Sequence, residues 1–385
     1  MNINLTEEQQ MIQDTARQFA ENELSPNAAK LDEGDNQKVL LNNLKQLAEL
    51  GFMGLSINGE YGGTEAGSVA FSLAITELAK GCASTAVTTS VTNMVAEVIQ
   101  AVGNEQQKQT YIPKICSGEY SAAGFCLTEA EAGSDPAGMK TTATKDGDQY
   151  VLNGAKMFIT SAEYAGVFVV WAVTDKDAKK GKGISCFLVE NGTPGLIIGP
   201  AEHKMGQKAS ATNEVRFENC RVAASALMGK ENDGFRVAVA ELAGGRIGIG
   251  SLALGVGQAA MDYARNYISE RKQFGQSLSN FQGLQWMMAD RYTELEAARL
   301  LLMNAACLKE QGKPFSKEAS MAKLFASEKA NNACYDAVQM LGGYGYIKEF
   351  PLERLSRDVR ITSIYEGTSE VQRIVIAREL LKELN

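Results

Sequence analysis

The sequence predicts a multidomain protein of the α+β class, with an N-terminal α-helical domain, a small middle β domain and a C-terminal helical domain. Three observations support this order. Helical periodicity runs to about residue 118, short alternating runs occupy roughly residues 121–217, and helical periodicity returns from Asp233 to the end. A chain of 385 residues is long enough for two or three domains. We expect the domains at 1–118, 119–228 and 229–385.

The first domain carries signals for helix starts and stops. Thr6 and Gln9 have the spacing of a capping box, which marks a helix N-terminus. A later leucine repeat stops at Gly51, a plausible helix C-cap. Residues 68–102 are rich in Ala, Ser and Thr with few charges, which predicts helices buried on more than one side. We expect Pro113 to close this helical segment.

The middle domain has a different period. Short alternating runs are bounded by Gly, Asp or Asn and predict strands at 141–144, 150–152, 167–173, 184–189 and 214–217. No helices alternate with these runs, as a parallel βαβ fold would demand. We therefore expect a small β-sandwich or barrel.

The last domain contains apolar stripes at helical spacing, which most often mark core packing. They comprise Leu252, Val256, Ala259 and Ala260, followed by Leu284, Met287, Met288 and Tyr292. Long helices with such stripes predict an antiparallel four-helix bundle. Its long, partly apolar faces suggest burial against other subunits.

Composition excludes several classes of function. The net charge of −8 makes nucleic acid an unlikely partner. We find no apolar run near the ~18 residues that cross a bilayer and expect no membrane span. Seven scattered cysteines and an N-terminus unlike a signal peptide indicate a cytoplasmic protein. The single histidine, His203, argues against a multi-histidine metal centre and a Ser-His-Asp hydrolase, so we expect no metal site.

Glycine-rich segments do not spell a nucleotide-binding fingerprint. The candidates, 244–245 and 342–345, follow no predicted strand and lack the Gly-x-Gly-x-x-Gly spacing. A Rossmann domain is therefore disfavoured, and any dinucleotide must be held another way.

Three other stretches have compositions that suit a flavin nucleotide. Residues 125–135 and 156–161 offer small residues, hydroxyls and an aromatic ring, which a flavin ring requires on its faces and edges. Arg271 could clamp a pyrophosphate. Ordinary loops and a solvated helix end remain alternative interpretations of these stretches.

Glu366 lies in a Gly/Thr/Ser-containing segment, 364–370, after an aromatic residue and before a glycine. A carboxylate held against apolar walls gains base strength, because burial raises its pKa. The alternative interpretation is a solvated residue or a helix cap.

Six segments in register resemble the acyl-CoA dehydrogenase family, and the likeness runs over essentially all 385 residues. The matching segments are 127–129 with 132–135, 158–160, 244–246, 271–275, 339–345 and 365–370. The resemblance implies a homotetramer in which FAD lies between the β domain and the C-terminal bundle. It also implies that Glu366 is the catalytic base.

The resemblance further assigns residues to the ligands. Flavin contacts would be Phe125, Leu127, Thr128, Gly133, Ser134, Phe158, Ile159 and Thr160. The pyrophosphate and adenosine end would be held across a subunit interface by Arg271, Phe274, Gln282, Gln339, Gly342 and Gly343, and Thr368 and Glu370 would complete the FAD site. Substrate contacts would come from Ser134, Ala243, Arg246 and Gly367.

The chain departs from the family pattern at three places. It has Ala130-Glu131 where Pro-Gly is common, Phe158 where Trp is common, and Ala243 where many members carry Asp. Some relatives carry the base on the residue before the matched arginine, which is Gly245 here. Glu366 therefore has no rival in this chain.

The implied reaction is α,β-dehydrogenation of an acyl-CoA thioester to a trans-2-enoyl-CoA, in fatty acid or branched-chain acyl-CoA oxidation. Electrons would pass to an electron-transfer flavoprotein. Similarity to short- and branched-chain members around residues 244–247 favours a short or branched acyl group. Alternatives are an acyl-CoA oxidase that uses oxygen, and a catalytically silent CoA- or FAD-binding assembly protein.

Overall fold

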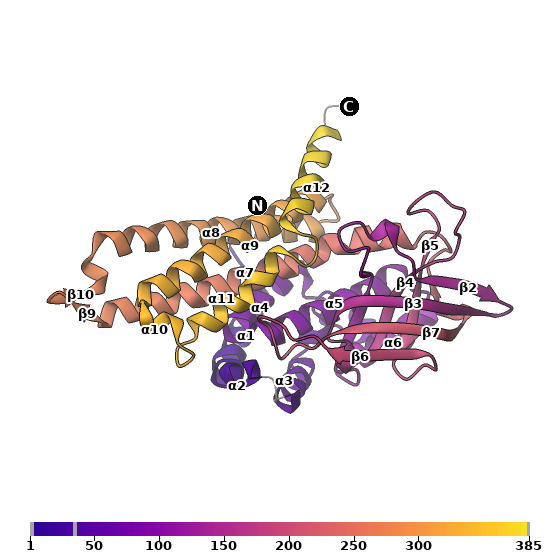
Figure 1. Ribbon diagram of the computed structural model, residues 1–385, viewed down its shortest axis with the longest axis horizontal. Helices are drawn as coiled ribbons and strands as arrows, with labels where there is room; N and C mark the ends of the chain where they lie inside the picture. Colours follow the sequence, from indigo (N-terminus) through magenta and orange to yellow (C-terminus); the bar gives the residue numbers. More distant parts are fainter. Residues whose placement is uncertain (1–3, 34–36, 383–385) are drawn as a thin grey trace.

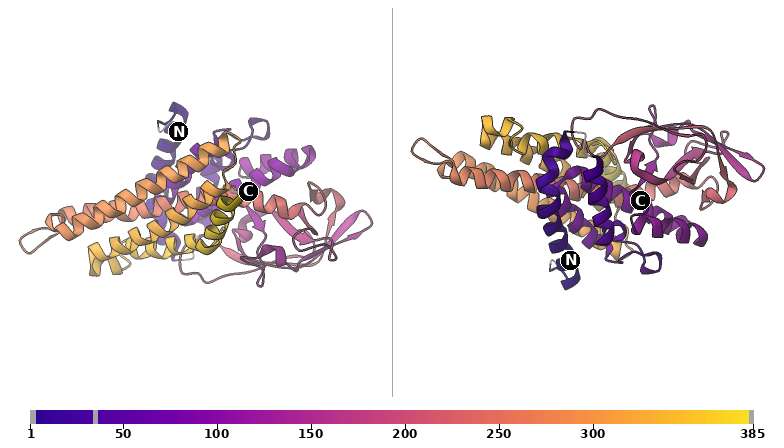
Figure 2. Two further views of the ribbon diagram at one scale, coloured as in Figure 1. Left: turned by 90° about the horizontal axis from the view of Figure 1, so that it is seen from above. Right: turned by 90° about the horizontal axis from the view of Figure 1, so that it is seen from below.

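The computed structural model describes residues 4–33 and 37–382. The molecule is elongated, with a helical bundle at one end and the β domain at the other (Figure 1). N-terminal helices cross the middle and are seen from two further directions in Figure 2. The predicted order of helical, β and helical domains is confirmed.

The described residues of the N-terminal part form α1 (Glu7–Phe19), α2 (Ala28–Asp32), α3 (Gln37–Glu49), α4 (Gly67–Gly81), α5 (Ala83–Val102) and α6 (Glu105–Cys116). Thr6 and Gln9 form the predicted capping box. Gly51 follows α3 with a φ of 80°, a left-handed conformation that favours glycine. The expectation for Pro113 is wrong, because Pro113 lies inside α6, which continues to Cys116.

Helices α4 and α5 are buried along nearly their whole length, as their small-residue composition predicts. Both pack against the long C-terminal helix α7 (Gly234–Glu270), and α5 also packs against strand β1 (Ala122–Cys126). Helix α5 therefore joins the bundle to the β domain.

The β domain is one connected sheet of eight strands in the order β6-β7-β3-β2-β4-β5-β8, with β1 beside β4. The remaining strands are β2 (Thr142–Asp146), β3 (Gln149–Thr160), β4 (Ala165–Val173), β5 (Ile184–Glu190), β6 (Leu196–Ala201), β7 (Thr212–Ala223) and β8 (Leu227–Met228). Strands β2 and β4 share one residue pair, Thr142 with Val173. The sheet folds over at this corner.

The interior of the β domain contains side chains from both halves of the sheet. Tyr150 and Phe217 come from one half, and Phe168 and Phe187 come from the other. This packing is the predicted sandwich. Strands β1 and β6 had no counterpart among the predicted runs, because β1 is short and small-residued and β6 is only partly buried.

The C-terminal domain contains α7, α8 (Gln282–Glu310), α9 (Ser316–Leu341), α10 (Gly343–Tyr346), α11 (Leu352–Arg360) and α12 (Ser369–Lys382). A hairpin of β9 (Lys272–Gln273) and β10 (Gln276–Ser277) connects α7 to α8 at the far end of the molecule (Figure 1). Helix α9 packs against α7, α8, α11 and α12. Helix α12 projects from the body of the molecule.

One expectation about apolar runs needs correction. Helix α7 is long and apolar enough, by length and composition, to cross a membrane, because its middle is rich in Gly, Ala, Ile and Leu. However, 72% of its most apolar window is buried inside the structure. That burial is typical of a core helix.

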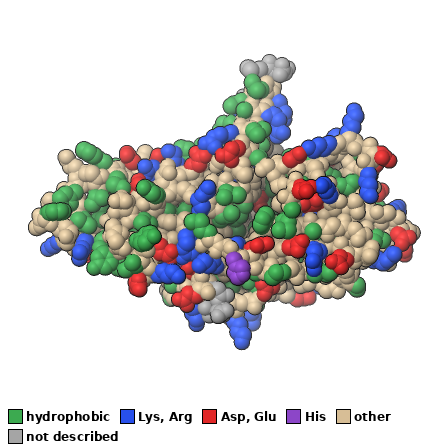
Figure 3. Space-filling model, in the orientation of Figure 1, with side chains coloured by type: hydrophobic (Ala, Val, Ile, Leu, Met, Phe, Trp, Pro, Cys, Tyr) green, Lys and Arg blue, Asp and Glu red, His purple; other side chains and the backbone are tan. Residues whose placement is uncertain are grey.

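The bundle end exposes large apolar side chains. Phe274 is 92% exposed, and Trp286, Tyr335 and Tyr346 are also exposed. Figure 3 shows hydrophobic side chains over this end of the molecule. Exposed patches of this kind mark interaction surfaces.

Candidate functional site

Glu366 lies on a sharp turn between the 3₁₀ helix Ile361–Ser363 and α12. Its φ is 52°, in the left-handed region that non-glycine residues seldom adopt, and Gly367 follows with a φ of 88°. A strained conformation persists only where the surrounding structure fixes it, and such residues cluster at functional sites.

The carboxylate of Glu366 points at helix α7. Its Oε2 atom is buried, and no described residue hydrogen-bonds it. A Cβ atom at Gly245 would lie 2.9 Å from this oxygen and 2.8 Å from Sδ of Met94. Gly245 is therefore the residue that makes room for the carboxylate.

Burial raises the pKa of Glu366 to about 7, although the cations Arg246 and Lys323 oppose this shift. A carboxylate with a pKa near neutrality is suited to general-base chemistry. The surroundings of this residue are therefore mixed rather than apolar as predicted, since two cations act on its carboxylate.

Two buried side chains hold the turn by its carbonyl oxygens. Lys323 Nζ donates to the Gly367 oxygen at 2.8 Å. Gln372 Nε2 donates to the oxygens of Glu366 at 3.0 Å and of Gly367 at 2.8 Å. In the described part of the chain, nothing accepts a hydrogen bond from the backbone N–H of Glu366. That N–H group is available to a ligand.

Arg246 lies one residue beyond Gly245 on α7 and is 6% exposed. It donates to the Ser320 hydroxyl at 3.1 Å, while its buried Nε has no partner among the described residues. Burial lowers the pKa of this guanidinium. Unsatisfied buried polar atoms are rare, so Arg246 Nε and Glu366 Oε2 together indicate a ligand site.

Ala243 is buried two residues before Gly245. The intervening Gly244 leaves room for Lys309, because a Cβ atom at Gly244 would lie 3.1 Å from the Lys309 Nζ. This Nζ forms an ion pair with Glu97 at 2.6 Å. Thus the Lys309–Glu97 ion pair lies beside this turn of α7. The position of Ala243 in this turn is the one at which many family members carry aspartate.

The β domain contributes a loop fixed by a buried ion pair. Lys156 is fully buried and pairs with Glu129 at 2.8 Å, and its Nζ also donates to the Leu127 oxygen at 3.2 Å. The N–H of Met157 donates to the Thr128 oxygen. Strand β3 is thereby tied to the segment that follows β1.

Phe158 has a φ of 59° and a side chain that is 61% exposed. It lies at an irregularity in the pairing of β3 with β7, between Lys156 and Ile159. An exposed ring at a strained bulge is the flat apolar surface expected beside a flavin. Ile159 is buried next to it, and Thr160 is half-buried.

The remaining β-domain candidates come from β1 and the segment after it, which the Met157–Thr128 hydrogen bond ties to β3. Phe125 is half-buried and packs against Trp171 with ring centroids 4.4 Å apart. Gly133 and Ser134 are exposed, and a Cβ at Gly133 would contact nothing within 4 Å. These residues present an open loop to a ligand.

The predicted pyrophosphate residues lie far from this region. Arg271, Phe274, Gln282, Gln339, Gly342 and Gly343 are all exposed at the end of the bundle. Arg271 stacks over Tyr344 at 5.6 Å. At about 1.5 Å per residue, roughly 37 Å of helix axis separates Arg271 from Arg246. One chain therefore does not bring the two predicted halves of the cofactor site together.

Thr368 and Glu370 lie at the start of α12. Thr368 Oγ1 accepts a hydrogen bond from the Val371 N–H at 3.3 Å, as a helix cap does. Glu370 is exposed in the first turn. Thr368 thus caps α12, and the FAD contacts at Thr368 and Glu370 stay predictions.

Two residues of the site were absent from the sequence predictions. Lys323 and Gln372 hold the Glu366 turn. One signal was available: Lys323 stands among alanines and other apolar residues in 319–326, an unusual setting for an exposed lysine.

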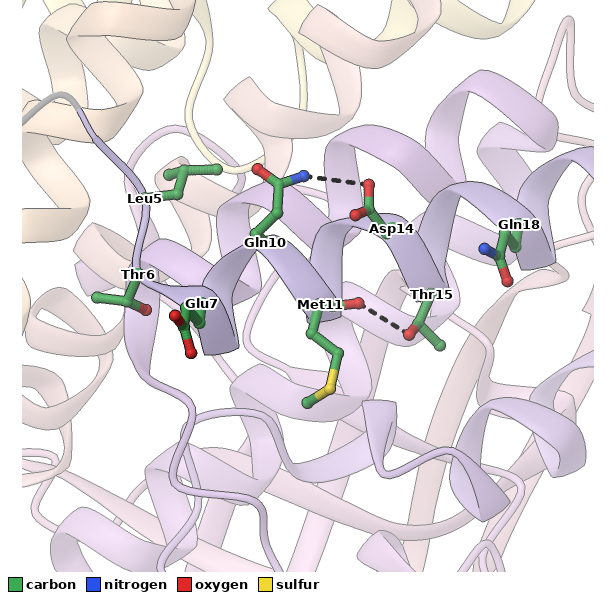
Figure 4. Close-up of a pocket in the computed structure, with 8 residues that line it drawn as sticks. All are labelled: Leu5, Thr6, Glu7, Gln10, Met11, Asp14, Thr15 and Gln18. Carbon is green, nitrogen blue, oxygen red and sulfur yellow. Dashed lines mark hydrogen bonds between the residues drawn. The ribbon is translucent and has the colours of Figure 1, made fainter.

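A shallow surface depression lies elsewhere, on α1. Leu5, Thr6, Glu7, Gln10, Met11, Asp14, Thr15 and Gln18 line it (Figure 4). All eight come from α1 and the residues before it, so it is an open face of one helix. It brings together no groups suited to catalysis.

Family models match each domain of the chain. The acyl-CoA dehydrogenase N-terminal domain matches residues 6–119, the middle domain residues 124–220 and the C-terminal domain residues 232–381.

Two curated relatives align over 99% of this chain. Acryloyl-CoA reductase (NADH) of Anaerotignum propionicum is 46% identical over 96% of its own length. The short-chain specific acyl-CoA dehydrogenase of Clostridium acetobutylicum is 45% identical over 100% of its length.

Among solved structures, work on the electron transferring flavoprotein of Acidaminococcus fermentans and flavin-based electron bifurcation supplies a similar chain. It superimposes with a TM-score of 0.95 at 45% identity, over 99% of this chain and 100% of that one. The chain therefore belongs to the acyl-CoA dehydrogenase family of flavin oxidoreductases, and that family binds FAD.

Proposed function

We propose that this chain is an FAD-dependent dehydrogenase of short acyl-CoA thioesters, with Glu366 as the base and an electron-transfer flavoprotein as the acceptor. One observation carries the proposal: the buried Oε2 of Glu366 and the buried Nε of Arg246 have no hydrogen-bond partner among the described residues, and burial raises the pKa of Glu366 to about 7. The product is the trans-2-enoyl-CoA, in fatty acid or branched-chain acyl-CoA oxidation.

Proton abstraction requires that the thioester be acidified. The free N–H of Glu366 would donate to the thioester oxygen as enolate charge develops, which lowers the barrier most where water is excluded. The carboxylate then takes the α-proton. When bound, FAD would accept the β-hydrogen as a hydride.

The described residues that could bind FAD fall into two groups that lie far apart in one chain. Phe158, Thr160 and the loop that includes Ser134 would hold the flavin end. Arg271 and Phe274 would hold the pyrophosphate end of a cofactor bound to another copy, since they lie too far along α7 to reach the same one.

We further propose a homotetramer. The exposed aromatic side chains at the bundle end and the exposed Ile374 on the projecting helix α12 support additional contacts between copies. All seven cysteines are free, which supports the proposed cytoplasmic location.

Packing along α7 supports a short acyl group. A Cβ at Gly248, one turn beyond Gly245, would lie 2.3 Å from Ser90 Oγ and 3.3 Å from the Phe71 ring. If the acyl group lies along this face, these side chains would limit its length. The relative in Clostridium acetobutylicum is described as short-chain specific.

The test is anaerobic mixing of the purified protein with acyl-CoA thioesters of four to sixteen carbons. We expect a yellow protein whose flavin absorbance bleaches fastest with the shortest thioesters and recovers on adding an electron-transfer flavoprotein. Rapid recovery in air would instead indicate an oxidase. Turnover of acryloyl-CoA with NADH, without thioester oxidation, would favour the reductase activity named for the relative. A protein that takes up no FAD would refute the proposal.

A further inference from the structure

The turn that carries Glu366 is held from behind by side chains of two other segments. Lys323 comes from the middle of α9 and Gln372 from the first turn of α12, and both are 0% exposed. We propose that Lys323 and Gln372 are positioning residues that clamp the carbonyl oxygens of this turn and so aim the base at the substrate. This inference rests on the proposed function.

Backbone geometry explains why a clamp is needed. Glu366 has a φ of 52°, which a side chain with a Cβ adopts only at a cost in energy. Without external contacts, the turn would relax to a common conformation and the carboxylate would leave Gly245. Three hydrogen bonds to two adjacent carbonyl oxygens oppose that relaxation.

The same hydrogen bonds orient the donors of the turn. In a planar trans peptide the C=O and the following N–H point in opposite directions. Gln372 fixes the oxygen of Glu366, so the N–H of Gly367 faces away from Gln372. Loss of the clamp would therefore displace both the carboxylate and the peptide group that follows it.

Lys323 also contributes charge. Its side chain is fully buried, and burial of a cation costs more free energy than burial of a methionine of similar size. Arg246 and Lys323 are the cations that act on the Glu366 carboxylate, and Tyr365 lies next to it. The carboxylates acting on Lys323 are Glu366, Glu370 and Glu328. Lys323 thus favours the ionised form of the base.

Replacement of each residue by methionine separates position from charge. For Gln372→Met we expect kcat for flavin reduction to fall roughly 10²-fold with little change in KM, as for a misplaced reacting group. Its pH profile should keep the wild-type midpoint. Lys323→Met should lower kcat similarly and also move the acidic limb of kcat/KM to higher pH, because a cation beside Glu366 is lost.

The matched control is Lys329→Met. Lys329 lies on the same helix, is partly exposed and pairs with Glu294 at 2.6 Å, away from the turn. It should retain the wild-type kcat and pH profile. All proteins are first checked for their bound FAD absorbance and melting temperature. Because Gln372→Met removes no charge, it still tests the clamp if Lys323→Met does not fold.

The outcomes separate two kinds of failure. Wild-type flavin that no acyl-CoA reduces would refute the proposed function itself. Normal wild-type reduction, with wild-type kcat in folded Gln372→Met and an unmoved pH profile in Lys323→Met, would refute the clamp. Equal losses in the Lys329→Met control would also refute it, since the effect would then be one of general stability.

Discussion

The Glu366 turn and the exposed end of the bundle are two regions of one candidate site with opposite construction. The turn is partly buried and is held by contacts within one chain: α7 supplies Gly245, α9 supplies Lys323 and α12 supplies Gln372. The bundle end is exposed, and Phe274, at 92% exposure, meets the ring of Phe281 at a centroid distance of 6.1 Å.

This difference separates the chemistry from the retention of the cofactor. Proton abstraction depends on contacts formed when a single chain folds. In contrast, the proposed grip on the pyrophosphate exists only after chains associate. Substitutions in the first region should therefore change rates, and substitutions in the second should change cofactor affinity.

Glu366→Gln should produce the largest effect. The amide cannot accept the α-proton, so we expect flavin reduction by acyl-CoA to fall about 10³-fold or more. Rapid mixing under anaerobic conditions measures this rate. FAD content should stay at the wild-type level, because the bundle end is unchanged. Substantial residual reduction would mean that another residue is the base.

Gly245→Ala should come next. The added Cβ would lie 2.9 Å from Glu366 Oε2 and 2.8 Å from Met94 Sδ, so the carboxylate must move. We expect a loss of about 10²-fold in kcat. The control is Gly199→Ala in β6, where the new methyl group would make ordinary contacts at 3.4 Å. Equal rates for the two variants would contradict a positioned carboxylate.

Arg271→Ala tests the other region. Loss of a charge-assisted hydrogen bond to a phosphate weakens binding by about 1.5–3 kcal/mol, or roughly 10- to 100-fold in the Kd for FAD. Titration of the apoprotein with FAD measures this. After saturation with FAD, the reduction rate should return to the wild-type value. A lower reduction rate that persists at saturating FAD would contradict the claim that the bundle end affects only cofactor affinity.

The smallest expected effect is the pH dependence. Burial raises the pKa of Glu366 to about 7, and only the ionised form is a base. Thus kcat/KM should rise as pH increases through about 7, with a change of about tenfold per pH unit well below that value. Arg271→Ala should show the same midpoint, since it does not contact the base. A shifted midpoint in that variant would indicate coupling between the regions.

The sequence predicted the regular parts of the fold because local chemistry determines them. The Thr6 capping box, the Gly51 turn and the buried helices 68–102 all follow from side-chain pattern. Strand β6 did not, because its half-buried residues lack alternation. Pro113 misled, because a proline late in a helix lacks one hydrogen bond without ending the helix.

The site divides in the same way. Motif order indicated Glu366, Arg246 and the flavin-facing segment. Motif order did not indicate Lys323 or Gln372, because both donate hydrogen bonds to a backbone carbonyl oxygen of the Glu366 turn. Such a contact leaves no pattern in the sequence around the donor. Polar residues in helices normally face solvent, and only the packing of α9 against α12 reveals that these two do not.

Helix α7 fixes the distance and the rotation between the Glu366 turn and the bundle end. One continuous helix of 37 residues starts at the β domain, passes the base at Gly245 and ends before Arg271. An insertion of one residue between these points would rotate Arg271 by about 100° and advance it by about 1.5 Å relative to the base. If Arg271 binds the cofactor of another copy as proposed, length changes in this helix would misalign that cofactor while leaving the contacts of the Glu366 turn intact.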